Sequence, residues 1–160
     1  MKCRNCGEII NCEITDVDSK ITFAWFNMLL ESIDSLPFET KREVVKGCSI
    51  SHFNAINMED ILKTYIGDVY SFIKFLETEW NWSVQINEGE RVIYADENKS
   101  QCICPIVKLG EIKTSLMCNC SEGFAEKMFT KVLQRNANAK VISSILNGDK
   151  SCAYEIRWGQ

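Results

Sequence analysis

The first half of the chain carries apolar residues at helical spacing. The segment 21–36, ITFAWFNMLLESIDSL, is apolar nearly all round, which predicts a largely buried helix. A second helix is expected over about 38–48. The clearest pattern begins after Asn57, a favoured N-cap residue, and continues to Trp80, so we expect the longest helix here. Its apolar positions recur at i, i+3, i+4 and i+7, and they are Met58, Leu62, Tyr65, Val69, Phe72, Ile73, Leu76 and Trp80.

Beyond this helix the period of the pattern changes to two, which is typical of strands. WSVQI (82–86) and RVIYA (91–95) flank NEGE, and this arrangement predicts a β-hairpin. CICPIV (102–107) and IKTSLMC (112–118) flank KLGE in the same way. The second pair of segments therefore predicts a second hairpin.

One more helix and one more hairpin complete the chain. SEGFAEKMFTKVLQR (121–135) returns to helical spacing, and AKVISSIL (139–146) and CAYEIRW (152–158) alternate around the strong turn sequence NGD. Helices followed by hairpins predict an α+β fold, with an antiparallel sheet built from hairpins and a helical N-terminal half packed on it. We expect a cysteine-bearing N-terminal arm over 1–18 and a single α+β domain over 19–160.

Composition and charge narrow the classes of function. The 160 residues are 46% hydrophobic and 25% charged, which is ordinary for one soluble globular domain. A net charge of -4, without basic runs, argues against a nucleic-acid partner and against an anionic membrane surface. The sequence shows neither a signal peptide nor an apolar stretch of the ~20 residues that span a bilayer. We therefore expect a cytoplasmic protein with no membrane partner, and the sequence leaves a homodimer open.

The chain contains nine cysteines and a single histidine. Two Cys-x-Cys pairs, Cys102/Cys104 and Cys118/Cys120, are separated by 13 residues. In strands, residues i and i+2 share a face, so a hairpin about KLGE would bring the four sulfurs together. Four thiolates suit a tetrahedral zinc ion, and they also suit an Fe–S cluster. The sequence predicts a zinc site here, with an Fe–S cluster as the alternative.

Three further roles for the two pairs stay open. The cysteines could be buried thiols used as small apolar side chains, a regulatory disulfide, or a catalytic thiol. Cys120 is expected at the start of a helix, where the helix dipole and free N–H groups favour a thiolate. Cys48 and His52 stand at i and i+4, share a helix face, and could replace one metal ligand.

A second group of cysteines lies in the N-terminal arm. CRNCG has the C-x-x-C-G spacing found in the metal-binding turns of zinc ribbons and rubredoxins, and it supplies Cys3 and Cys6. Cys12 could be a third ligand. The arm is therefore a candidate for a second metal site.

The C-terminal third resembles a known family. CNCSEGFAEKMFTKVL followed by KVISSILNGDKSCAYEIRW is similar to the small-molecule-binding domains of the 4-vinyl reductase type, with Gly-Asp-x-x-Cys ending at Cys152. The resemblance implies an α+β fold related to the haem-nitric-oxide-binding fold, and zinc held by these cysteines. Where relatives often carry another cysteine, this chain has Ser143 and Ser144. The pair Cys102/Cys104 could compensate for that difference.

Three functions follow from these residues and from the resemblance. The first is a non-catalytic, zinc-binding, sensor-like domain for a small apolar or aromatic ligand. The second is a cysteine-dependent hydrolase of the amino-thiazoline carboxylate type, although no residues can be assigned as catalytic. The third is an Fe–S or redox thiol protein. Aromatic residues that could line a ligand cavity, or only a core, are Trp25, Phe26, Tyr65, Tyr70, Phe72, Trp80, Trp82 and Tyr94.

Overall fold

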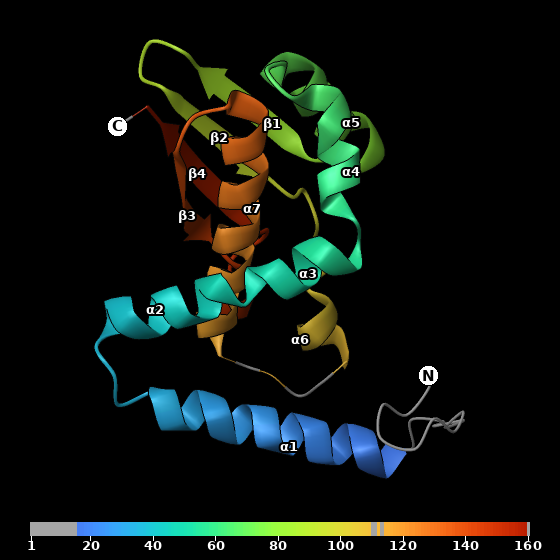
Figure 1. Cartoon of the computed structure of the whole chain (residues 1–160). Helices are drawn as coiled ribbons and strands as arrows, with labels where there is room; N and C mark the ends of the chain where they lie inside the picture. Colours follow the sequence, from blue (N-terminus) through green and yellow to red (C-terminus); the bar gives the residue numbers. More distant parts are fainter. Residues whose placement is uncertain (1–15, 110–111, 113, 160) are drawn as a thin grey trace, which may run out of the picture.

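The structure, a computed structural model, describes residues 16–109, 112 and 114–159. Helices cover one face of a single antiparallel sheet (Figure 1), which confirms the predicted α+β fold with a helical N-terminal half packed on the sheet. The strands are β1 (Ser83–Asn87), β2 (Val92–Asp96), β3 (Ala137–Ser143) and β4 (Ala153–Trp158). The α-helices are α1 (Asp16–Ile33), α2 (Phe38–Gly47), α3 (Ser49–Ala55), α4 (Met58–Leu62), α5 (Val69–Glu79), α6 (Pro105–Leu109) and α7 (Cys118–Leu133). Short 3₁₀ turns are η1 (Lys63–Tyr65), η2 (Ser115–Met117) and η3 (Ile145–Asn147).

The sheet consists of two hairpins that pair through their inner strands. Its order is β1-β2-β4-β3, and every neighbouring pair is antiparallel. The hairpins predicted at 82–95 and 139–158 are both confirmed. Ile93 stands opposite Ile86 on one side and Ile156 on the other, so apolar side chains line up across the covered face.

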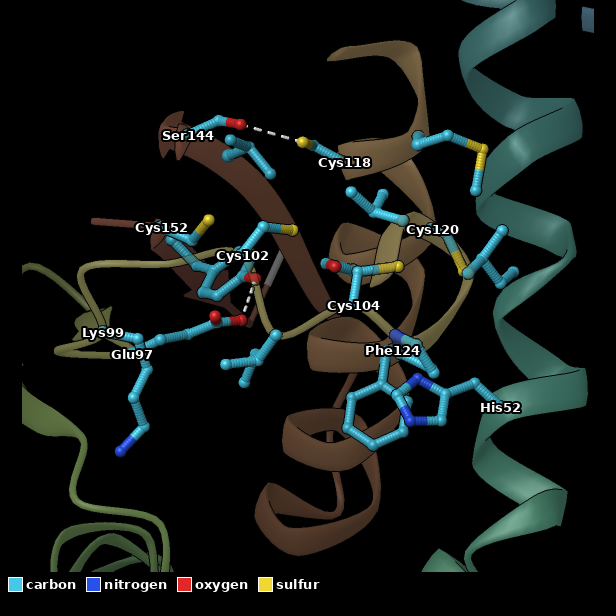
Figure 2. Close-up of a pocket in the computed structure, with 18 of the residues that line it drawn as sticks. His52, Glu97, Lys99, Cys102, Cys104, Cys118, Cys120, Phe124, Ser144 and Cys152 are labelled. Atoms are coloured by element: carbon cyan, nitrogen blue, oxygen red, sulfur yellow. Dashed lines mark hydrogen bonds between the residues drawn. The ribbon is translucent and has the colours of Figure 1, made fainter. Parts of the chain in front are cut away.

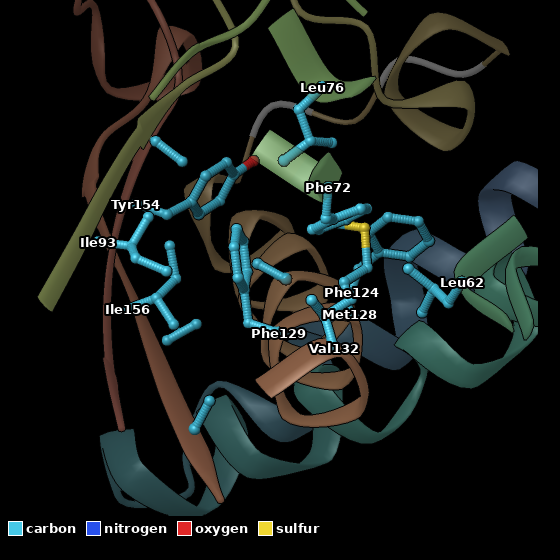
Figure 3. Packing of buried hydrophobic residues seen from close by; sticks show 14 of the residues in the cluster. Leu62, Phe72, Leu76, Ile93, Phe124, Met128, Phe129, Val132, Tyr154 and Ile156 are labelled. Carbon is cyan, nitrogen blue, oxygen red and sulfur yellow. The ribbon is translucent and has the colours of Figure 1, made fainter. Parts of the chain in front are cut away.

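The main core lies between this face and the helices. Helix α7 runs along the sheet and contributes Met128, Phe129 and Val132, all fully buried (Figure 3). Helices α4 and α5 add Leu62 and Phe72 from the far side of α7. Because α7 is covered on both sides, its position fixes where its first turn lies relative to the sheet.

The prediction of one long helix between Asn57 and Trp80 is wrong. The chain forms α4, η1 and α5 instead, and α1, with 18 residues, is the longest of the described helices. Gly67 has φ +80, which ends the first helical segment, and its N–H donates to the carbonyl of Val132 at 2.8 Å. Asp68 then caps α5 by accepting from the Ser71 N–H at 3.0 Å.

The prediction of a β-hairpin at 102–118 is also wrong. Pro105 occupies the first position of α6, where its fixed φ and missing N–H are tolerated. Thr114 caps η2 through its side chain, and α7 begins at Cys118. The prediction that Cys118 and Cys120 stand at the start of this helix is confirmed.

Helix α1 lies at the outer edge of the molecule (Figure 1) and is not largely buried, contrary to the expectation for 21–36. Its inner face, with Phe23, Phe26 and Leu30, packs on a second apolar cluster that includes Val45. Its opposite face is exposed. Among the described helices, none combines the length and the hydropathy that a bilayer crossing requires.

The free edge of β3 is covered by side chains of α7. Glu122 and Glu126 accept hydrogen bonds from the N–H groups of Val141 and Ala139, at 2.8 and 3.1 Å. Glu122 and Glu126 are one helical turn apart, and this distance along α7 is close to the distance between alternate residues of a strand, so each carboxylate meets one amide of β3. This pairing satisfies edge amides that would otherwise be open to another strand.

Helix α2 supplies the opposite charges for these carboxylates. Arg42 Nε lies 2.8 Å from Glu122 Oε2, and Lys46 Nζ lies 3.0 Å from Glu126 Oε2. The Arg42 side chain also donates to the Ala139 carbonyl at 3.4 Å. Burial is the largest single effect on the pKa of Arg42 and lowers it, but coulombic attraction to Glu122 and the hydrogen bond that Arg42 donates to Glu122 raise this pKa overall. The network joins α2, α7 and the edge of the sheet.

Candidate functional site: an apolar pocket lined with thiols

A pocket of about 630 Å³ lies at one end of the sheet. It is bounded by the end of β2, the start of β4, the first turns of α7 and helix α3 (Figure 2). The coil before α6 and the first turn of α6 form a further wall. The volume falls in the range of about 300–1,000 Å³ that is typical of small-molecule sites.

Apolar and aromatic side chains make up most of the lining. Trp80 and Trp82, which follow α5, contact each other with ring centroids 5.6 Å apart. Phe124 of α7 packs on His52 of α3 at 4.7 Å between centroids. Further apolar lining residues are Ile103, Pro105, Ile106, Val107, Met117, Val141 and Leu146.

The predicted aromatic lining is confirmed only in part. Trp80 and Trp82 line the pocket. Trp25, Tyr70 and Tyr94 are exposed. The remaining three residues pack in or against the two apolar clusters and do not line this pocket: Phe26, Tyr65 and Phe72.

All six of the described residues that the sequence proposed as metal ligands line this one pocket. They are Cys48, His52, Cys102, Cys104, Cys118 and Cys120. Cys152, at the start of β4, joins them. The start of α7 and the coil before α6 bring the two Cys-x-Cys pairs together, in place of a hairpin. Cys3, Cys6 and Cys12 lie outside the described residues.

The predicted zinc-binding sensor domain is nevertheless wrong. Among the residues that the structure describes, no three His, Cys, Asp or Glu side chains converge as metal ligands must. The sulfurs stand around the wall of the pocket and do not share one centre (Figure 2).

Burial also opposes the thiolate form that a nucleophile needs. It raises the pKa of Cys120 and of Cys152 to about 11. It raises the pKa of Cys118 and Cys102 as well. Desolvation therefore outweighs the helix dipole that was expected to favour a Cys120 thiolate. At neutral pH these four thiols are protonated and present small, weakly polar surfaces to the cavity.

His52 does not complete a catalytic pair. Its ring stacks on Phe124, and burial lowers its pKa, so the imidazole is neutral at pH 7. Cys118 shares a hydrogen bond of 2.9 Å with the Ser144 hydroxyl, so its hydrogen-bond partner is a hydroxyl and not an imidazole. These contacts do not support a cysteine-dependent hydrolase.

A buried carboxyl and a buried phenol form the polar corner of the pocket. Tyr154 donates to Glu97 Oε1 at 2.5 Å, and both residues are buried. Desolvation, above all, raises the pKa of Glu97 and holds the pKa of Tyr154 well above its usual value. Lys99, also at the pocket, points its ammonium away from the thiols (Figure 2).

Sequence reasoning missed Glu97 and Tyr154 as site residues. Glu97 directly follows a strand, and Tyr154 stands at an inward position of β4. A carboxylate at the end of an alternating strand was the available signal. It carries little weight without the fold, because most such residues face solvent.

Comparisons with known proteins give no family. No family model matches the chain, and no curated protein matches it. A solved structure with a similar arrangement is trafficking protein particle complex subunit 3 from Naegleria fowleri, covalently bound to palmitic acid. It is 11% identical, and the match covers 91% of this chain and 98% of that chain with a TM-score of 0.46. The resemblance to 4-vinyl reductase-type domains is wrong as a family assignment, since no model of that family or of any other matches the chain.

Proposed function

We propose that the pocket binds a small, neutral, apolar molecule without covalent attachment. The observation that carries the proposal is a cavity of about 630 Å³ lined by aromatic, aliphatic and thiol side chains. A filled core leaves few voids larger than a water molecule, so a cavity of this size stands apart from ordinary packing. The bound metal and the sensor role expected from the sequence form no part of this proposal.

The lining supplies the free energy of binding mainly through apolar contact. Each methylene transferred from water to such a wall contributes about 0.8 kcal/mol. Protonated thiols of Cys118 and Cys120 add polarizable surface without adding charge. These features favour an alkyl chain or an aromatic ring as the buried part of the ligand.

The polar corner favours a neutral group on that ligand. Glu97 lies among apolar groups and already accepts from Tyr154. A carboxylate brought beside it would face a like charge in a poorly solvated site, which is strongly unfavourable. A hydroxyl group could donate to Glu97 without that penalty.

Titration calorimetry with two probes of equal chain length tests the proposal. We expect 1-decanol to bind at pH 7 and decanoate to bind about tenfold more weakly or worse. The variant Cys104→Trp places a large ring in the pocket wall and should abolish decanol binding. Ile142→Trp is the matched control, since Ile142 is exposed on β3 and does not line the pocket.

Three results would contradict the proposal. Decanol could fail to bind the wild-type chain at all. The control Ile142→Trp could lose as much affinity as Cys104→Trp. Decanoate could bind as tightly as decanol, which would show that the polar end of the ligand does not lie beside Glu97.

A further inference from the structure

Helix α1 carries a stripe of apolar side chains that no described part of the chain covers. Val17, Ile21, Trp25 and Met28 follow one another at intervals of four, four and three residues, and Leu29 adjoins them. Such spacing places them on one side of the helix. They are 62%, 62%, 64%, 60% and 42% exposed in that order, and we call these five residues the outer stripe.

This exposure is unusual because α1 is apolar on its other face too. Phe23, Phe26 and Leu30 pack on the body of the protein, and the outer stripe points away from it. A helix that is apolar all round is normally covered on all sides. Here the fold covers one side only, so the sequence is suited to a partner on the other.

We propose that the outer stripe is the interface of a homodimer, in which α1 packs antiparallel against α1 of a second copy of this chain. This inference is independent of the pocket and of its ligand. The stripe lies on the outermost element of the molecule (Figure 1), so a second copy can approach it.

The exposed area matches what a stable dimer needs. A large, fully exposed side chain presents about 150–250 Å² to solvent. Multiplied by the exposed fractions of the five residues, this gives on the order of 500 Å² of exposed apolar surface in the outer stripe. A standard interface buries about 800 Å² per partner, and about 65% of that area is apolar in homodimers, or roughly 520 Å². The remainder would come from the polar residues on either side of the stripe.

Charge along one flank of the stripe favours the antiparallel arrangement. Lys20 and Glu31 are both exposed and are 11 residues apart, three turns of helix, so they lie on the same flank. Trp25 stands next to their midpoint. A two-fold axis there brings Lys20 of each copy toward the partner copy's Glu31, because the same flanks of the two helices meet in an antiparallel pair.

Sedimentation equilibrium under reducing conditions tests the interface, because reduction excludes dimers joined by disulfides. We expect the wild-type chain to be dimeric, and Trp25→Lys to raise the dimer dissociation constant at least a hundredfold, as expected for a central aromatic anchor. Tyr70→Lys is the matched control, since Tyr70 is 57% exposed on α5 and lies outside the stripe. Circular dichroism should show both variants folded, because neither side chain is buried.

A charge exchange then tests the orientation. Lys20→Glu alone and Glu31→Lys alone should each weaken the dimer about two- to fivefold, and the double variant should restore it. A wild-type chain that stays monomeric overturns the proposal and leaves the stripe to another protein or to a bilayer surface. A dimer that survives Trp25→Lys also overturns it. Failure of the double variant to restore association would refute the antiparallel arrangement.

Discussion

Helix α7 approaches the backbone of α2 closely at Gly123, and a single methyl group should disrupt this contact. Gly123 lies in the second turn of α7, where α7 crosses α2 and α3. A Cβ at this position would stand 2.4 Å from the Lys46 carbonyl oxygen and 2.6 Å from Ser49 Oγ. We predict that Gly123→Ala destabilises the protein.

The size of the effect follows from two opposed contributions. Alanine is a better helix former than glycine by about 1 kcal/mol. Against this, an ordinary contact of about 3.5 Å requires the Lys46 backbone to move by about 1 Å, and overpacking of this kind destabilises by about 1–3 kcal/mol or more. Because the nearest atom belongs to the backbone, we place the strain at the upper end. The free energy of unfolding should therefore fall by about 2 kcal/mol, which lowers the melting temperature by about 4–8 °C.

Gly47→Ala provides a control with the opposite sign. Gly47 is the last residue of α2, and a Cβ there would meet no atom within 4 Å. This variant should gain about 0.4–1 kcal/mol, since alanine restricts the unfolded chain. Urea unfolding followed by circular dichroism measures both. The reasoning would be refuted if Gly123→Ala were as stable as the wild type, or if both substitutions shifted stability in the same direction.

Two further predictions concern buried polar groups. Burial raises the pKa of Glu97, so the folded chain holds this proton more tightly than the unfolded chain, and stability falls as pH rises from the usual carboxyl pKa through the raised one. The variant Glu97→Gln keeps an acceptor for Tyr154 and should remove this loss of stability at high pH. Its melting temperature should therefore exceed the wild-type value at pH 8 but not at pH 4. An equal difference at both pH values would count against this prediction. Ser49 Oγ is buried and has no hydrogen-bond partner in the described part of the chain, so Ser49→Ala should stabilise by about 1 kcal/mol in urea unfolding. A loss of stability there would mean that the hydroxyl is satisfied.

The sequence predicted the fold well where one signal dominated. The two hairpins at 83–96 and 137–158 were visible because alternation and turn residues agreed. The helix expected over 121–135 was visible from its 3.6-residue period, although it begins three residues earlier, at Cys118. The break at Gly67 was missed because an unbroken 3.6-residue period outweighed a glycine followed by an N-cap residue. At Pro105 the alternation of CICPIV suggested a strand, although proline suits the first turn of a helix.

The candidate site could be predicted only as a set of residues. The Cys-x-Cys pairs, Cys48 and His52 do come together around one pocket. Their chemistry could not be predicted, because it depends on burial and on the direction of each side chain, which spacing does not specify. Desolvation keeps the thiols of Cys118 and Cys120 protonated, so they act as pocket lining and not as nucleophiles. The partner pair Glu97 and Tyr154 is 57 residues apart along the chain, so only the sheet register joins it.

The edge of β3 gives the last prediction, because three elements meet there through one carboxylate. Glu122 is 2% exposed, accepts from Arg42 and from the Val141 N–H, and would leave a partly buried guanidinium and an unpaired amide if removed. Glu122→Ala should therefore destabilise by about 3 kcal/mol in urea unfolding, since it removes a charge-assisted hydrogen bond and leaves an edge amide unpaired. Glu126→Ala, one turn further along, is the control: its side chain is 26% exposed, its partner Lys46 keeps an ion pair with Glu43 at 3.5 Å, and its loss should be about 1–2 kcal/mol. Equal losses at the two positions would show that burial does not set the strength of this edge, and a smaller loss at Glu122 would show that Arg42 finds another partner.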